Sequence, residues 1–139
     1  MQTAHRLINS MLRVKLEESF ATLDIMRLEL NGGTVQFLKS GAAQSFLFRD
    51  GGLKAIGGQA FPAGILAECT PDVSELKLFD GDILLMTSDG VEDATAREIL
   101  RCNGMNAQEI VTALGAKALA QRTGGRRDDI TIIAAKIPS

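Results

Sequence analysis

The first 18 residues alternate polar and apolar positions with the spacing of a helix. Apolar side chains recur every three or four residues, at Ala4, Leu7, Ile8, Met11, Leu12 and Val14. Polar side chains fill the positions between them, and neither Gly nor Pro interrupts the segment from Thr3 to Glu18. This pattern predicts one amphipathic helix.

After Phe20 the pattern changes to short apolar runs separated by turn residues. Asn31-Gly32-Gly33 and Asp50-Gly51-Gly52 each lie between two such runs and are typical of hairpin turns. The strands predicted from these runs cover residues 23–30, 34–40, 45–49 and 53–56.

The second half of the chain combines a buried strand with two helices. Asp80-Gly81-Asp82 predicts a tight turn into Ile83–Met86, which is apolar on both faces and therefore reads as a buried strand. Asn106 followed by Glu109 predicts a capping box that opens a helix running to about residue 122. The remaining predicted elements are a short helix over 94–102 and strands over 72–78 and 130–135.

The order of these elements predicts stacked antiparallel sheets with helices on an outer face. With 139 residues and no internal repeat, we expect a single domain over residues 1–139. Lys and Arg number 15 against 17 Asp and Glu, and Trp and Tyr are absent. This composition argues against nucleic-acid binding, because it supplies neither an excess of positive charge nor the usual stacking side chains.

No apolar run approaches the length of a membrane span, and the N-terminus has no signal-peptide pattern. We therefore expect a cytoplasmic segment without membrane contact, even if a longer parent protein is membrane-anchored. Cys69 and Cys102 are far apart and lack CxxC spacing. We interpret them as reduced thiols, with a disulfide or a zinc site as the alternative.

Two acidic clusters flank predicted buried strands. Thr87–Asp93 directly follows the strand over residues 83–86, and Arg126–Thr131 leads into the last strand. Two carboxylates held at neighbouring strand ends repel each other unless a cation lies between them, and oxygen ligands suit Mg²⁺ or Mn²⁺. The alternative is structural, since Asp-Gly is a common turn and Asp128-Asp129 also fits a solvated loop or cap.

Other catalytic classes find less support in the sequence. A Ser–His–Asp or Cys–His site would depend on His5, the single histidine, which the pattern predicts to be exposed on the first helix. No GxxxxGK[ST] or GxGxxG segment is present. Arg126 and Arg127 could contact a phosphate, or they belong to a charged loop that faces water.

Five segments in order resemble motifs of the metal-dependent serine/threonine phosphatases of the type 2C class. Phe79–Val91 resembles the "GD-hydrophobic-SDG" motif of that class, and Arg127–Thr131 resembles its closing "D-[DN]-[hydrophobic]-T" motif. Within the class, the bacterial branch typified by stage II sporulation protein E is the most similar. The segments that carry the likeness to this branch are 19–24, 37–42 and 61–65.

The resemblance implies an αββα sandwich of two mainly antiparallel sheets flanked by helices, with a two-metal site that takes Mn²⁺ or Mg²⁺. In the family, water held by the metals yields a hydroxide that attacks phosphoserine or phosphothreonine. By motif position, Asp89 and Asp128 match metal ligands, Gly90 follows the first ligand, and Asp93 matches an acidic position used for a weaker additional metal. Asp129 stands where many relatives have Asn, beside the ligands.

One family feature has no match in the chain. The upstream "Asp-Gly-x-Gly" strand end and an earlier acidic residue supply the remaining metal ligands in the family. The segment from Gln2 to Lys15 resembles the second of two regulatory helices. We therefore expect the N-terminal part of the domain to be missing, metal binding by this chain to be weak or absent, and the isolated chain to be inactive or nearly so. We also expect an open sheet edge, or the N-terminal helix, to allow homodimers.

Two functional hypotheses follow. The first is part of a signalling phosphatase of the sporulation type, whose substrate would be a phosphorylated bacterial regulatory protein, by analogy an anti-sigma-factor antagonist. The second is a non-catalytic interaction domain derived from such a phosphatase, which binds a partner through the N-terminal helix and the sheet edge.

Overall fold

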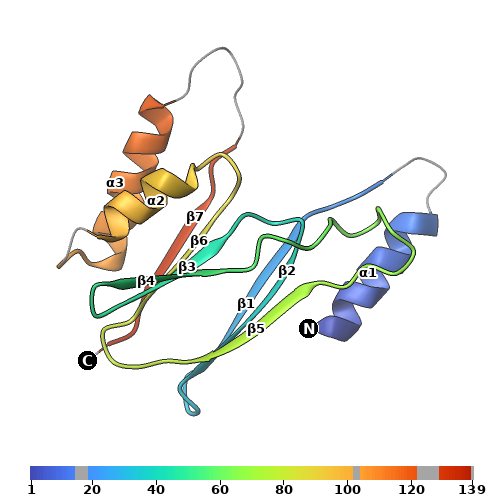
Figure 1. The fold of residues 1–139 in the computed structure, drawn as a ribbon, viewed down its shortest axis with the longest axis horizontal. Helices are drawn as coiled ribbons and strands as arrows, with labels where there is room; N and C mark the ends of the chain where they lie inside the picture. Colours follow the sequence, from blue (N-terminus) through green and yellow to red (C-terminus); the bar gives the residue numbers. More distant parts are fainter. Residues whose placement is uncertain (15–18, 102–103, 122–128, 139) are drawn as a thin grey trace. The chain divides into compact units, whose positions relative to one another are not determined.

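The computed structural model describes residues 1–14, 19–101, 104–121 and 129–138, which form three helices and seven strands (Figure 1). In chain order these are α1 Gln2–Val14, β1 Leu23–Glu29, β2 Thr34–Ser40, β3 Ser45–Arg49, β4 Gly52–Ile56, β5 Asp72–Lys77, β6 Ile83–Thr87, α2 Asp93–Leu100, α3 Ala107–Ala120 and β7 Ile132–Lys136. Every predicted helix and strand has its counterpart in the described residues, whereas the predicted helix ends at 15–18, 102 and 122 lie outside them. The last strand begins at Ile132 rather than at Ile130.

The chain divides into two compact units. The first unit comprises residues 1–42 and 56–78, and the second comprises residues 43–55 and 79–139. Each unit contains one antiparallel sheet and helical structure of its own. The expectation of a single domain stays a prediction.

In the first unit, an antiparallel sheet with the strand order β1-β2-β5 carries a row of three charged residues, of which the central one is buried. Lys39 in β2 lies directly between Asp24 in β1 and Asp72 in β5. The Lys39 side chain is buried, and its Nζ lies 2.5 Å from Asp24 Oδ2. Burial lowers the pKa of Lys39 and raises that of Asp24, because desolvation outweighs the hydrogen bond between them.

Helix α1 forms as predicted, but it buries a polar face. His5 and Asn9 are buried, whereas Leu7, Met11 and Val14 are 61%, 63% and 83% exposed. The prediction of an exposed histidine was therefore wrong. His5 is buried because its Nε2 lies 3.1 Å from the Ser40 hydroxyl at the end of β2, a partner that helical spacing does not reveal.

In the second unit, β6 lies between β3 and β7 in a sheet with the order β4-β3-β6-β7. All five residues of β6 are buried, as predicted. Helices α2 and α3 cover one face of this sheet and share a hydrophobic core with it (Figure 1). The capping box at the start of α3 is confirmed, with Asn106 Oδ1 accepting from the Glu109 N–H and Glu109 Oε2 accepting from the Asn106 N–H.

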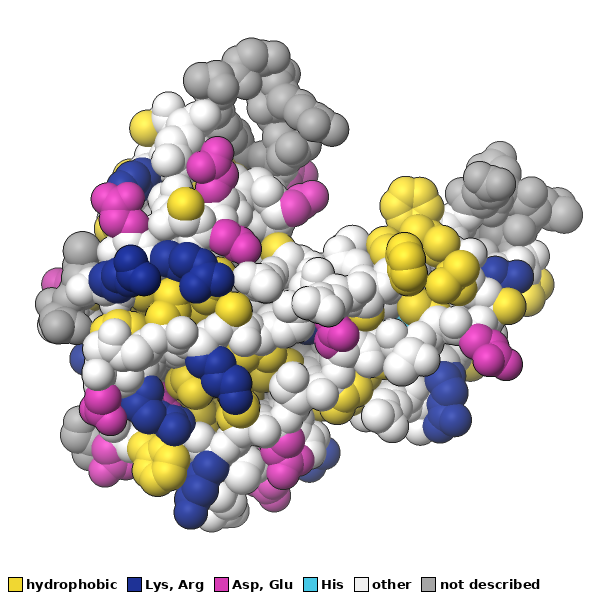
Figure 2. All heavy atoms as spheres, in the orientation of Figure 1, with side chains coloured by type: hydrophobic (Ala, Val, Ile, Leu, Met, Phe, Trp, Pro, Cys, Tyr) yellow, Lys and Arg dark blue, Asp and Glu magenta, His cyan; other side chains and the backbone are white. Residues whose placement is uncertain are grey.

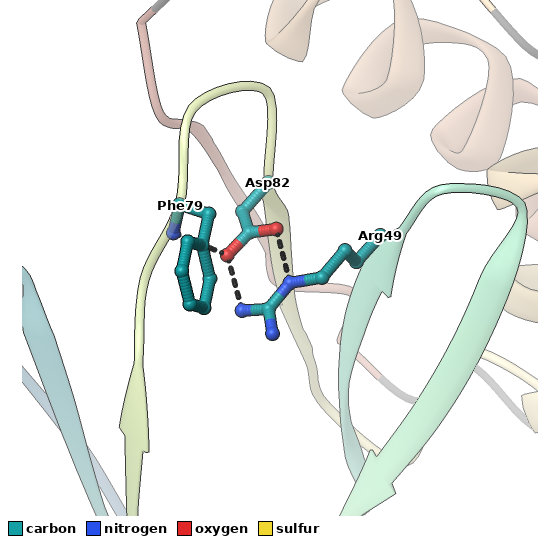
Figure 3. Close-up of polar contacts among 3 residues, drawn as sticks. All are labelled: Arg49, Phe79 and Asp82. Carbon is teal, nitrogen blue, oxygen red and sulfur yellow. Dashed lines mark hydrogen bonds and ion pairs between the residues drawn. The ribbon is translucent and has the colours of Figure 1, made fainter.

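The N-terminal end of β6 is fixed by a polar cluster of three residues (Figure 3). Arg49 donates from Nε and Nη2 to the two carboxylate oxygens of Asp82, at 2.7 and 2.6 Å. The Phe79 N–H donates to Asp82 Oδ2 at 2.9 Å, and the Arg49 guanidinium lies 4.5 Å from the centre of the Phe79 ring. Asp82 is thus a structural residue that ties the turn before β6 to the end of β3.

Two antiparallel sheets and three helices among the described residues confirm the predicted fold class of mixed antiparallel sheets with flanking helices. Among these residues, no helix has both the length and the apolar character needed to cross a membrane.

Candidate metal centre

The C-terminal end of β6 is held against the segment that leads into β7. The Ser88 N–H donates to the Thr131 carbonyl at 2.9 Å, and the Thr131 N–H donates to Ser88 Oγ at 2.9 Å. The same hydroxyl donates to the Asp129 carbonyl at 3.1 Å. Ser88 therefore brings the described parts of the two acidic clusters together.

Gly90 allows this close approach. A Cβ atom on Gly90 would lie 2.8 Å from the Asp129 carbonyl oxygen and 3.1 Å from Ile130 Cγ1. Such distances are shorter than van der Waals contact, so any larger residue would push the two segments apart. The glycine of the Ser-Asp-Gly sequence thus has a steric role next to Asp89.

The carboxylates of this region are exposed at the end of a rigid strand. Asp89 directly follows Ser88 and is exposed, as are Asp93 and Asp129. Asp93 is the first residue of α2, where its negative charge interacts favourably with the positive end of the helix dipole. Asp128 lies outside the described residues, so its predicted place beside Asp89 stays a prediction.

The chemistry of these donors suits a hard divalent cation, because carboxylate oxygens are the ligands that Mg²⁺ and Mn²⁺ prefer. Within the described ranges, however, no group of three or more His, Cys, Asp or Glu side chains could hold a metal ion. The described residues therefore fit one side of a metal site and do not complete it.

Comparison with known proteins identifies the family. The family model for stage II sporulation protein E matches residues 1–138. The chain belongs to the stage II sporulation protein E (SpoIIE) family. Stage II sporulation protein E of Priestia megaterium is 30% identical over 141 residues, which cover 94% of this chain and 24% of that protein. The chain thus spans about a quarter of the length of this SpoIIE relative.

Solved structures show which part of SpoIIE the chain matches. A Bacillus subtilis SpoIIE structure, containing the PP2C phosphatase domain and a fragment of the regulatory domain, has a TM-score of 0.81 at 30% identity. The match covers 96% of this chain and 43% of that one. The manganese-presoaked phosphatase domain of the same protein gives a TM-score of 0.74 at 28% identity, with 99% and 66% coverage. The resemblance to the SpoIIE-type phosphatase domain is confirmed.

Gly90→Ala provides a test of the steric role of this glycine. We expect the free energy of unfolding to fall by about 2 kcal/mol, since the new methyl group overlaps the backbone of Asp129. Chemical denaturation measures the change.

Gly115→Ala is the matched control. A Cβ at this α3 position would meet its nearest neighbour, Ile132 Cδ1, at 3.8 Å, so the helix should gain up to about 1 kcal/mol. Equal effects of the two substitutions would contradict the steric role of Gly90.

Sequence reasoning found Asp89 and Gly90 from their place after a buried strand, but it missed Ser88. Its hydroxyl makes two of the hydrogen bonds that join the clusters. The position of Ser88 next to Asp89 was visible in the sequence, whereas its partners lie more than 40 residues later.

Proposed function

We propose that this chain forms the Asp89 side of a metal-dependent protein serine/threonine phosphatase site. The observation that carries the proposal is the pair of hydrogen bonds that the Ser88 hydroxyl makes with Asp129 and Thr131. They hold the end of a buried strand, where Asp89 is exposed, beside the second acidic segment. Membership of the SpoIIE family and the match to its phosphatase domain support the same assignment.

Asp89 and Asp128 would be the ligands that this chain contributes to Mn²⁺ or Mg²⁺, with Asp93 as donor to a weaker additional ion. Asp129 would lie beside the ligands, and its carbonyl accepts from Ser88. A divalent ion supplies Lewis-acid activation of water and neutralises phosphate charge when bound. The manganese-presoaked SpoIIE structure supports manganese as the first metal to test.

The 139-residue chain by itself should hydrolyse p-nitrophenyl phosphate no faster than background in the presence of Mn²⁺. The physical reason is the small number of donors: no group of three or more His, Cys, Asp or Glu among the described residues could hold a metal ion, and Asp128 adds a single carboxylate to them. A steady-state assay with and without Mn²⁺ measures this. Hydrolysis at ordinary phosphatase rates that Asp89→Ala abolishes would show that the chain holds a complete site.

The substrate class proposed is a phosphoserine- or phosphothreonine-bearing bacterial regulatory protein, with an anti-sigma-factor antagonist as the first candidate. This proposal rests on the family, because the described residues show no feature that selects one phosphoprotein. A cytoplasmic place of action is proposed on the same ground.

The alternative proposal is a protein-interaction domain, and exposed apolar surface on the first unit favours it. Leu7, Met11 and Val14 form an exposed stripe on α1. Figure 2 shows further hydrophobic side chains gathered around the segment before β5, next to α1. The exposed residues of this segment include Phe61, Ile65 and Leu66. Patches of this kind are common at protein interfaces.

A test of this alternative is whether the exposed apolar stripe on α1 mediates self-association. We expect a concentration-dependent dimer in sedimentation velocity, weakened by Leu7→Glu, which places a charge on the exposed stripe without touching the buried face of α1. A chain that stays monomeric at high concentration would remove support for the homodimer.

A further inference from the structure

Helix α1 is held in place by polar contacts that recur once per helical turn. His5 Nε2 lies 3.1 Å from the Ser40 hydroxyl. Asn9 Oδ1 accepts from the N–H of Gly64 at 2.7 Å, and Asn9 Nδ2 donates to two carbonyls of the segment 64–67 at 3.2 and 3.3 Å. Arg13 donates to another carbonyl of that segment at 3.4 Å. The helix depends on hydrogen bonds because much of its apolar side is exposed.

The hydrogen bonds around Ser40 fix which nitrogen of His5 carries the proton. Ser40 Oγ donates its single hydrogen to the Phe61 carbonyl at 2.7 Å. The Cys69 thiol, 3.7 Å from Ser40 Oγ, also donates to that carbonyl, at 3.3 Å. Ser40 Oγ must therefore accept from His5, which assigns the proton to Nε2 and leaves a lone pair on Nδ1.

Nδ1 of His5 is buried and has no hydrogen-bond partner among residues 1–14, 19–101, 104–121 and 129–138. The imidazole has no exposed surface, so a proton added to Nδ1 would create a buried cation whose new N–H has no acceptor. Protonation therefore opposes the docked position of α1.

In the described part of the chain, the charged groups around α1 supply no acceptor for Nδ1 of His5. On α1, Arg6 and Arg13 are both cationic. On β2, Lys39 points to the opposite face of the sheet and pairs with Asp24. The titratable groups on the neighbouring elements include Glu75 on β5, which accepts a hydrogen bond from Gln36, and Asp72 on β5, which accepts from the N–H groups of residues 59 and 60. On the segment before β5, Glu68 is exposed and the Cys69 thiol donates to the Phe61 carbonyl.

We propose that α1 is a pH-sensitive latch: neutral His5 holds the helix on Ser40 and the 61–69 segment, and protonation of His5 releases it. Burial lowers the pKa of His5, in agreement with this role. Because the folded-state pKa is below that of the unfolded chain, near 6.5, docking is strongest above that pH. It weakens as the pH falls toward the lower, folded-state value.

The test is NMR on the 139-residue chain between pH 7.5 and pH 5. His5 is the single histidine, so its ring C–H signals report its titration without ambiguity. Hydrogen exchange of the Gly64 N–H, corrected for intrinsic rates, reports the docking of Asn9. We expect the Gly64 protection factor to fall about tenfold or more between about pH 6.5 and the midpoint of the His5 titration, and to level off below that midpoint. The Leu85 N–H in β6 should keep its protection.

His5→Gln separates the latch from general acid unfolding, since the amide can donate to Ser40 but does not titrate. In this variant the Gly64 protection should be independent of pH over the same range. The proposal is overturned if wild-type Gly64 protection does not change while His5 titrates, or if the variant loses it equally. In the wild type, a loss of protection that levels off at the His5 midpoint tests the proposal even if the variant does not fold.

Discussion

Lys39→Met is expected to lower the free energy of unfolding by about 4 kcal/mol. The substitution removes the buried cation next to Asp24 and leaves this half-buried carboxylate without its ion-pair partner, while its Oδ1 makes no hydrogen bond within the described part of the chain. A buried carboxylate without compensation is among the largest single-residue costs. Chemical denaturation followed by circular dichroism measures the change.

The double variant Lys39→Met/Asp24→Leu separates two contributions to the free energy of unfolding: the cost of leaving Asp24 unpaired and the net contribution of the ion pair. Because desolvation dominates both ionisations, replacing both charges with apolar groups should leave stability within about 1 kcal/mol of the wild type. Lys117→Met removes a partner from an exposed pair with Glu98 and should cost less than about 1 kcal/mol. A double variant less stable than Lys39→Met alone would contradict this account of the row.

Asp82→Asn is expected to cost about 3 kcal/mol. The carboxylate is only 1% exposed and accepts two hydrogen bonds from Arg49, which is 34% exposed, and one from the Phe79 N–H. An amide cannot accept from both guanidinium nitrogens with both of its polar atoms, so the turn before β6 loses its tie to β3.

The pH dependence of this loss tests its electrostatic origin. Burial alone would raise the pKa of Asp82, but the hydrogen bonds from Arg49 and Phe79 and the guanidinium charge outweigh it and hold that pKa below its usual value. The carboxylate therefore stabilises the fold fully above about pH 4 and loses that effect as the pH falls through its lowered pKa. The stability difference between wild type and Asp82→Asn should shrink below pH 4. A difference that is constant down to pH 2 would contradict the assignment.

The sequence pattern correctly predicted the helices and strands that are determined by residues close together in the chain. Ile83–Met86 is apolar at every position, which gave the buried strand, and Asn106 with Glu109 gave the start of α3. The position of Asp89 after that strand was equally visible. The approach of its neighbours Ser88 and Gly90 to Asp129 could not be predicted, because it depends on the pairing of β6 with β7 and joins residues about 40 positions apart.

Buried polar residues could not be predicted because their partners are distant in sequence. Helical spacing placed His5 on the exposed side of α1, because its hydrogen-bond partner Ser40 lies 35 residues later in the chain. The strand pattern over residues 34–40 gave no indication that Lys39 is buried, because the register that places it between Asp24 and Asp72 joins distant strands. Asp82 was read as a turn residue, and its bond to Arg49 spans 33 residues.

We propose that Asp89 is a ligand in a metal-dependent phosphatase site that this chain forms in part. The most direct measurement is manganese-dependent hydrolysis of p-nitrophenyl phosphate by a chimera, in which this chain replaces the matching part of the Bacillus subtilis SpoIIE phosphatase domain. We predict activity that requires Mn²⁺ and falls at least about a hundredfold in Asp89→Ala, since a carboxylate ligand is lost. A folded chimera without manganese-dependent hydrolysis, or an Asp89→Ala chimera as active as its parent, would contradict the claim.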